Sequence, residues 1–129
     1  MLVISLSTFA VDVPKVVADA FAKKFPSATN IKWGKENAKE YEAEFKINGK
    51  SMSANFLSDA SWVETEAEIA TSEIPAAVKS VVEKKYPGAV ISKVFKIDNV
   101  KGEVTYEAEI KTGNKKKEVN LKVDGTILK

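Results

Sequence analysis

The sequence predicts an α+β fold, a tandem repeat whose antiparallel sheet of about eight strands carries two helices on one face. The main observation is that the chain contains nearly the same segment twice. The segment 13–26 returns at 74–87, an offset of 61 residues, and Tyr41–Phe45 returns as Tyr106–Ile110, an offset of 65. A repeat of this length is a whole helix-plus-sheet unit rather than one rung of a solenoid.

Each copy begins with a predicted helix, at residues 14–25 and 75–86. Pro14 and Pro75 suit the first helical turn, where the missing N–H has no partner to lose. Apolar residues then recur at helical spacing, and Pro26 and Pro87 end the two segments. Both helices are therefore expected to lay an apolar stripe on a sheet.

The remainder of each copy alternates apolar and polar residues, which predicts strands. Asn48-Gly49 is a strong hairpin signal between two of them. The alternation gives every strand an apolar face toward a helix and a polar, open face. The predicted strands are 30–35, 40–47, 50–57 and 62–69 in the first copy, and 90–98, 104–111, 115–123 and 126–128 in the second.

The open face supplies the candidate binding residues. Because side chains alternate in direction along a strand, Trp62 is expected on the polar face beside Glu64. An aromatic ring on an exposed face is a favoured interface anchor. Trp62, Leu57 and Ile127 would then form a docking stripe. The other interpretation is that Trp62 packs against a loop or the seam between the repeats. The full candidate set is Trp62, Leu57, Ile127, Glu42, Glu44, Glu64, Glu66 and Asn55.

The alternating glutamates have a plain explanation, since charged strand faces keep sheets soluble and unstacked. Weak Ca²⁺ binding by neighbouring glutamates is a second explanation. Glycoside-type catalysis by a carboxylate pair is a third, but it requires a cleft and a raised pKa, which a solvated strand face does not supply. The sequence therefore favours a protein that is not an enzyme.

Composition narrows the function further. The 129 residues include no Cys and no His, and all 20 cationic residues are Lys. These absences exclude thiolate chemistry and the usual general base, and they remove the main reader of guanine and phosphate. We therefore expect no cofactor, no metal site of the usual kind and no nucleic-acid partner. Residues 13–73 carry 8 Lys and 10 acids, whereas residues 74–129 carry 12 Lys and 7 acids.

Residues 1–10 resemble the apolar part of an export signal ending in Thr8-Phe9-Ala10, without its basic start. The mature chain would begin near Val11; a buried N-terminal strand is the alternative. We expect a first α-β4 repeat at 11–73 and a second at 74–129, together forming one compact body. No other segment is long enough to span a membrane.

These motifs resemble those of PepSY-like, or β-lactamase-inhibitor-like, proteins exported by Gram-negative bacteria. The resemblance rests on the paired Pro helices, the two Tyr-Glu-Ala-Glu strands, Ala54-Asn55-Phe56 and the closing 124–128 segment. It covers residues 12–129, and the chain departs from the usual Asp-Gly turn at Asp59-Ala60.

The resemblance implies a fold like that of the β-lactamase inhibitor protein and a periplasmic or secreted location. It also implies a binding module that docks a protein or peptide on its open sheet face, with inhibition of an envelope enzyme or protease as one form of that role. The alternative is a periplasmic protein that binds a small ligand or Ca²⁺ through its acidic face. We expect a monomer or a weak homodimer.

Overall fold

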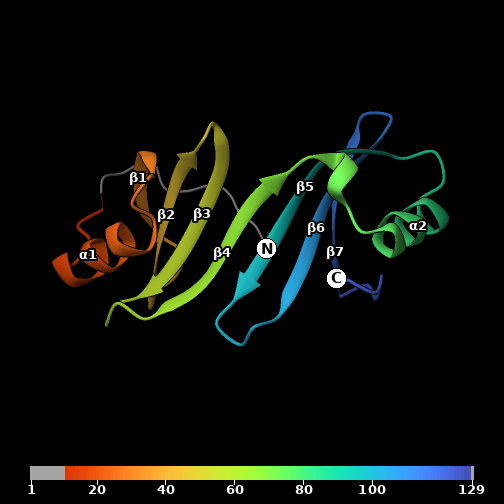
Figure 1. Cartoon of the computed structure of the whole chain (residues 1–129). Coiled ribbons are helices and arrows are strands. Elements are labelled where there is room, and N and C mark those ends of the chain that lie inside the picture. Colours follow the sequence, from red (N-terminus) through yellow and green to blue (C-terminus); the bar gives the residue numbers. More distant parts are fainter. Residues whose placement is uncertain (1–10, 129) are drawn as a thin grey trace. The chain divides into compact units, whose positions relative to one another are not determined.

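A computed structural model describes residues 11–128, so the predicted export segment at 1–10 lies outside the described residues. The described chain contains two α-helices, one short 3-10 helix and seven strands (Figure 1). In order they are α1 (Lys15–Lys24), β1 (Thr29–Lys35), β2 (Glu40–Ile47), β3 (Lys50–Leu57), β4 (Trp62–Ile69), η1 (Thr71–Glu73), α2 (Ala76–Lys85), β5 (Val90–Asn99), β6 (Val104–Thr112) and β7 (Lys115–Lys122).

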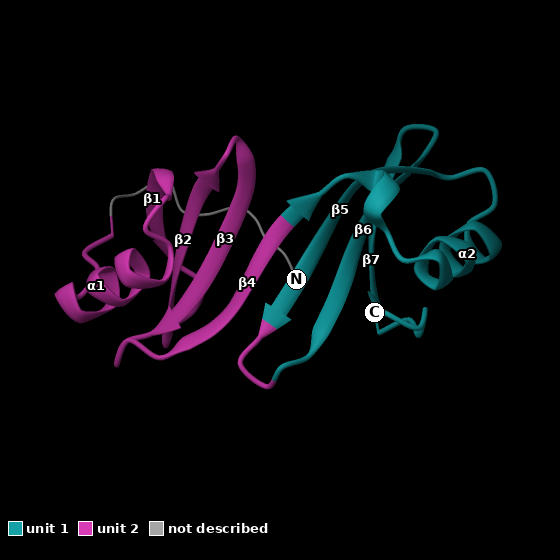
Figure 2. Cartoon of the chain, in the orientation of Figure 1, with its two compact units in different colours: residues 1–2, 68–98, 102–129 teal, residues 3–67, 99–101 magenta. Residues whose placement is uncertain are grey.

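The chain divides into two compact units, coloured separately in Figure 2. Among the described residues, the N-terminal unit (magenta, unit 2) includes 11–67 together with 99–101. The C-terminal unit (teal, unit 1) includes 68–98 and 102–128. The boundary falls within β4, six residues before the predicted end of the first repeat at residue 73, and that repeat boundary stays a prediction.

The predicted fold class is confirmed: two helices accompany a seven-stranded antiparallel sheet. Strands that follow one another in the chain are also neighbours in the sheet. The order is β1-β2-β3-β4 in the N-terminal half and β5-β6-β7 in the C-terminal half. The eighth predicted strand, 126–128, is reduced to an isolated bridge between Leu121 and Ile127.

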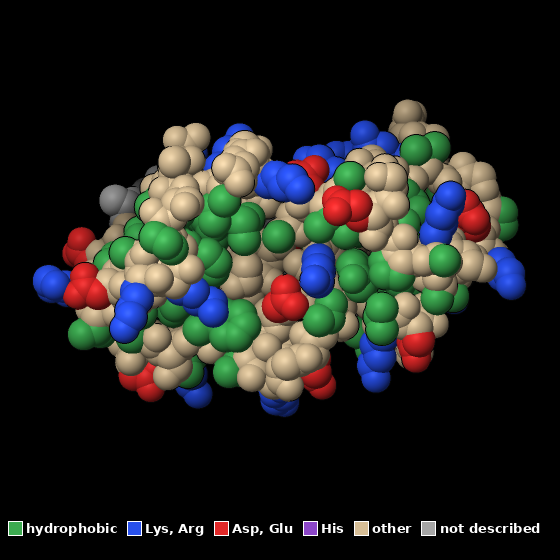
Figure 3. Space-filling model, in the orientation of Figure 1, with side chains coloured by type: hydrophobic (Ala, Val, Ile, Leu, Met, Phe, Trp, Pro, Cys, Tyr) green, Lys and Arg blue, Asp and Glu red, His purple; other side chains and the backbone are tan. Residues whose placement is uncertain are grey.

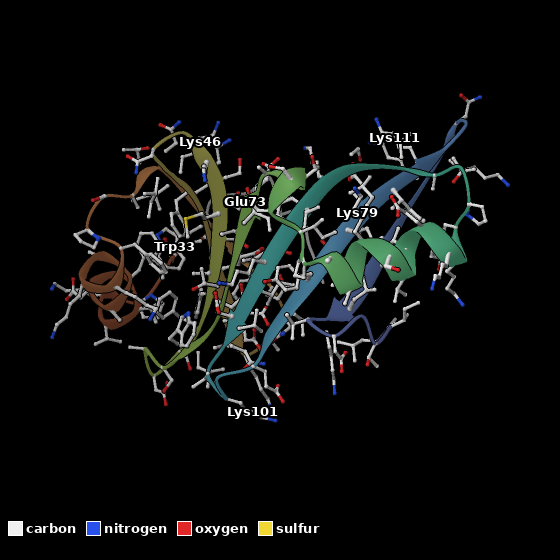
Figure 4. The ribbon with its side chains drawn as sticks, turned by 45° about the vertical axis from the view of Figure 1, so that its right-hand side comes forward. Trp33, Lys46, Glu73, Lys79, Lys101 and Lys111 are labelled. Carbon is white, nitrogen blue, oxygen red and sulfur yellow. The ribbon has the colours of Figure 1, made fainter. Side chains whose placement is uncertain are left out.

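An aromatic cluster forms the core of the N-terminal unit. Phe21 of α1 lies with its ring centroid 4.9 Å from that of Phe45 and 5.3 Å from that of Trp33, both edge to face. Ala43 and Ala54 are fully buried beneath the helix, where small side chains let α1 approach the sheet. Figure 4 shows Trp33 between α1 and its sheet.

The core of the C-terminal unit is aliphatic instead. Val78 and Val82 of α2 pack on Val94, Ile110 and Leu121, together with the partly exposed ring of Tyr86. The positions match those of the first unit, because Phe21 and Val82 are 61 residues apart and occupy the same turn of their helices. The two repeats therefore share a backbone plan with different side-chain volumes.

Among residues 11–128, no helix is both long enough and apolar enough to cross a membrane.

Candidate functional site: the polar faces of the two sheets

Two rows of polar side chains cross the N-terminal sheet on the face opposite α1. In one row Glu42 of β2 lies between Gly34 of β1 and Asn55 of β3, and Asn55 lies opposite Glu64 of β4. The neighbouring row runs in the same way through Lys32, Glu44, Ser53 and Glu66. The register thus brings together five of the predicted site residues: Glu42, Glu44, Asn55, Glu64 and Glu66.

Hydrogen bonds tie some of these side chains together. The Asn55 Nδ2 group donates to Glu40 Oε1 at 3.1 Å, and the Ser53 hydroxyl donates to Glu66 Oε1 at a long 3.5 Å. Glu42 is the exception at the centre of the face. Its side chain is only 3% exposed, and within residues 11–128 its Oε1 atom has no hydrogen-bond partner. A buried acceptor without a donor costs stability, so its retention needs an explanation.

The second repeat reproduces this arrangement. Glu107, the counterpart of Glu42, is 1% exposed and lies opposite Asn120 of β7, as Glu42 lies opposite Asn55. Its other cross-strand neighbour is Phe95 of β5, where the first repeat has Gly34. A Glu–Asn cross-strand pair is therefore common to both units, in different surroundings.

Burial changes the acidity of these carboxyl groups. Burial, together with the nearby carboxylates of Glu36 and Glu44, raises the pKa of Glu42 to about 8. Burial likewise raises the pKa of Glu107 to about 7. The pKa values of Glu44 and Glu64 are also raised, mainly by burial. The expectation that a strand face would leave its glutamates with ordinary pKa values is wrong.

Trp62 does not lie on this face, so its predicted outward position is wrong. The β3–β4 register shifts between Asn55 and Phe56, because Asn55 lies opposite Glu64 whereas Phe56 lies opposite Trp62. Val63 is thus an extra residue, and the resulting bulge turns Trp62 toward the helix. Its ring packs on the aromatic core, with Lys24 Nζ 4.1 Å from the ring centroid and its Nε1–H donating to Thr65 Oγ1 at 2.8 Å.

Ile127 also packs inward, on the core of the C-terminal unit, and its predicted outward position is likewise wrong. It bridges Leu121, whose side chain belongs to that core. Leu57 lies opposite Glu40, so its side chain is on the polar face as predicted, and it is half-buried. The predicted stripe of three apolar anchors is therefore not formed.

Two apolar residues on the helix-free face of the C-terminal unit were missed. Phe95 lies opposite Glu107 and Ile97 lies opposite Thr105, and Ile97 is buried although it belongs to neither core cluster. The signal was present in the sequence, because Val94 facing inward requires Phe95 and Ile97 to face outward. Among residues 11–128, no group of three or more acidic side chains is placed to hold a metal ion, and weak Ca²⁺ binding by neighbouring glutamates stays a prediction.

Comparison with known proteins gives the family. The sequence profile of the PepSY-like family, described as "putative beta-lactamase-inhibitor-like", matches residues 8–52 and 39–129. The chain belongs to the PepSY-like family. The two overlapping matches accord with the two repeats of this PepSY-like chain. No curated protein matches it in sequence.

Solved structures show the same fold as this PepSY-like protein. A periplasmic protein from Bacteroides eggerthii, described as putative, superposes with a TM-score of 0.83 at 24% identity, over 92% of this chain and 88% of that one. A DUF2874 family protein from Bacteroides uniformis gives 0.80 at 24%, over 91% and 87%. A BLIP-like protein from Bacteroides fragilis gives 0.74 at 24%, over 95% and 87%.

Proposed function

We propose that this PepSY-like chain is an exported, non-enzymatic binding module that docks a basic segment of a protein partner on the acidic face of its N-terminal unit. The observation that carries the proposal is Glu42, whose buried Oε1 atom has no donor within the described residues. Below its pKa of about 8 Glu42 is mainly protonated in the free protein, and a Lys or Arg side chain from a partner would favour the carboxylate form and supply the missing hydrogen bond.

The surroundings of Glu42 support a cationic partner. Glu36 and Glu44 both raise its pKa through their charges, so repulsion disfavours the ionised form of Glu42 in the free protein. A bound ammonium or guanidinium group would relieve that repulsion. The rows also place Glu64 and Glu66 on the same face, as the antiparallel register requires. α1 packs on the opposite, apolar face of this sheet.

The family supports a protein partner and an envelope location. Its description is inhibitor-like, and one structural neighbour is described as periplasmic. An envelope enzyme is therefore the partner class we favour. Because Trp62 packs against α1, we assign the recognition to the carboxylates and leave Leu57 as the apolar contact at the end of the row.

The test uses residues 11–129 and a fluorescent ten-residue peptide of alternating Lys and Thr, which suits an extended strand-like pose. We expect saturable binding that weakens as salt rises, because exposed charges are screened. Glu42→Gln combined with Glu64→Gln should weaken binding at least tenfold. The matched control, Glu83→Gln with Glu103→Gln, replaces the same number of carboxyl groups at residues outside these rows and should bind as the wild type does.

Equal weakening by both double variants would show that only net charge matters and would overturn the proposed site. Absence of binding by the folded wild type, to this peptide and to its Arg counterpart, would overturn the proposal that the face recognises a basic segment. Circular dichroism of each variant checks that the fold is retained.

A further inference from the structure

A hollow of about 310 Å³ lies in the C-terminal unit, and none of its lining residues belongs to the acidic rows. It is bounded by η1, α2 and the start of β5, and apolar side chains are visible between η1 and α2 in Figure 3. Its apolar lining consists of Ile74, Val82, Ala89 and Ile91, and its polar lining consists of Thr71, Ser72, Lys79 and Glu83. A volume near 300 Å³ is at the small end of the range for ligand pockets.

Comparison of the two repeats explains why space remains here. The counterpart of Val82 is Phe21, whose ring lies within 6.5 Å of four other aromatic rings in the N-terminal core. In the C-terminal unit an isopropyl group replaces that ring, and Val82 is still 1% exposed at the hollow's floor. The first repeat therefore has the ring of Phe21 at the position where the second repeat has the smaller Val82 beside the hollow.

The same comparison accounts for the charges at the rim. Lys79 and Glu83 stand where the first repeat has Ala18 and Ala22. They are one helical turn apart on α2, a spacing at which Lys15 and Asp19 of α1 form an ion pair of 2.7 Å. Within the described residues Lys79 and Glu83 form no such pair, so both charges at the rim are available to a ligand. Figure 4 labels Lys79 on α2.

The opposite wall is held in place by local hydrogen bonds. Glu73 Oε1 accepts the Ala70 N–H at 2.9 Å, and the Glu73 N–H donates to the Ala70 carbonyl at 2.9 Å. These bonds fix η1, which presents the hydroxyl groups of Thr71 and Ser72 to the hollow. Either hydroxyl can donate to an anion or accept from an ammonium group.

We propose that this hollow binds a free aliphatic α-amino acid, with Lys79 meeting its carboxylate, Glu83 meeting its ammonium group and the apolar lining holding its side chain. Opposite charges one turn apart complement a zwitterion, and the floor of Val82, Ala89 and Ile91 suits a branched hydrocarbon. The small volume favours a single residue over a peptide. This site is independent of the acidic face proposed above.

The test is a titration of the ¹⁵N-labelled protein with L-leucine, followed by amide chemical shifts. We expect saturable shifts at η1, α2 and the start of β5, with Kd on the order of 0.1–1 mM for so small a ligand. Lys79→Gln and Glu83→Gln should each weaken binding at least fivefold. Lys84→Gln, on the same helix but outside the hollow, should leave it unchanged. Glycine, 4-methylpentanoate and isopentylamine should each bind at least tenfold more weakly than leucine.

Val82→Phe should abolish binding by introducing the ring that the first repeat has at this position. If Val82→Phe does not fold, Ala89→Leu should abolish binding instead, because it fills the floor of the hollow. The proposal is overturned if folded wild type shows no saturable shift at 20 mM leucine. It is also overturned if 4-methylpentanoate binds as well as leucine, or if leucyl-leucine binds more tightly than leucine. Equal binding of 4-methylpentanoate would indicate an apolar pocket that does not recognise the ammonium group. Tighter binding of leucyl-leucine would indicate that the ligand is a peptide.

Discussion

Ala60 is a residue whose backbone conformation does not suit it. Its φ angle is +78°, in the left-handed region that costs a non-glycine residue roughly 1–2 kcal/mol. The matching turn of the second repeat has Gly125 with φ +92°, and both turns are closed by an Asp side chain that accepts a backbone N–H two residues on, at 2.9 Å. The departure from Asp-Gly in the first turn is therefore strained rather than differently folded.

We expect Ala60→Gly to raise the free energy of unfolding by about 0.5–1 kcal/mol, since relief of strain exceeds the added entropy of the unfolded chain. The reciprocal change, Gly125→Ala, should lower it by about 2 kcal/mol or more, because the new Cβ would lie 2.8 Å from Val81 Cγ2 and 3.0 Å from the Ala77 carbonyl oxygen. Urea denaturation of both variants measures the two effects. A loss of stability in Ala60→Gly would contradict the assignment of strain.

Glu42 should make stability depend on pH. Its pKa is about 8 in the fold and near 4.5 when unfolded, so the folded protein holds this proton more tightly. The stabilising contribution is fully present below about pH 4.5 and is lost as the pH rises through 8. Glu42→Gln should flatten this part of the profile and raise the free energy of unfolding at pH 8 by roughly 1–3 kcal/mol.

Denaturation at several pH values between 4 and 9 provides the measurement, with the exposed Glu103→Gln as control. Glu107, with a pKa of about 7, should retain a weaker dependence of the same sign in the Glu42→Gln variant. Parallel profiles for the wild type and Glu42→Gln would show that Glu42 titrates normally in the fold.

At the scale of elements, the sequence predicted helices and most strands to within two residues. Each helix is delimited by local chemistry: Pro14 and Pro75 precede α1 and α2, and Pro26 and Pro87 follow them. The hairpin between β2 and β3 was equally clear, because Asn48-Gly49 takes positive φ at both residues, as a two-residue turn requires.

A bulge accounts for the error about the direction of Trp62. Alternation assumes an unbroken period of two, and one extra residue reverses every side chain beyond it. Val63 does this in β4 and turns Trp62 inward. Ser92 does it in β5, between Ile91 opposite Ile110 and Lys93 opposite Glu109, so that Ile91 and Val94 both join the core. Nothing in a single sequence marks Val63 as the bulged residue.

The sequence predicted which residues share the polar face of the N-terminal unit, but not how deeply they are buried. The alternation of polar and apolar residues placed the five polar residues of the two rows on one face, as the register does. The raised pKa values of Glu42, Glu44 and Glu64 result mainly from burial between neighbouring strands, which periodicity does not express. The hollow beside α2 could not be predicted from the sequence, because its lining comes from η1, α2 and the start of β5, whose packing is not expressed by periodicity.

For the whole molecule, the two copies have kept one backbone plan and diverged in chemistry. The first is aromatic inside and acidic on its helix-free face, whereas the second is aliphatic inside and rich in lysine. Their charges differ accordingly, with a net −2 for residues 13–73 and +5 for residues 74–129. The divergence extends to buried positions, since Glu42 is 3% exposed at one proposed site and Val82 is 1% exposed at the other.

The outer strands of the two units, β1 and β7, are both protected against pairing with another chain. In β1 the register shifts between Thr29 and Lys32, and Asn30 has a φ of +53°. In β7 the segment 126–128 occupies part of the outer edge, since the Lys122 N–H donates to the Thr126 carbonyl at 2.8 Å and the Leu128 N–H to the Asn120 carbonyl at 2.7 Å. The rest of β7 carries consecutive lysines at 115–117. Bulges and lysines are both common means of preventing edge-to-edge association.

We therefore expect a monomer in sedimentation velocity at concentrations up to about 100 µM. Replacing Lys115, Lys116 and Lys117 by Thr should produce concentration-dependent association, because Thr favours strands and the like charges facing Lys111 would be gone. The control variant changes Lys84, Lys85 and Lys101 to Thr and should stay monomeric, since it removes the same charge away from the edge. A wild-type dimer that persists at both low and high salt would show that these edges are not protected. Association of both triple variants would indicate that net charge, rather than the lysines of β7, keeps the chains apart.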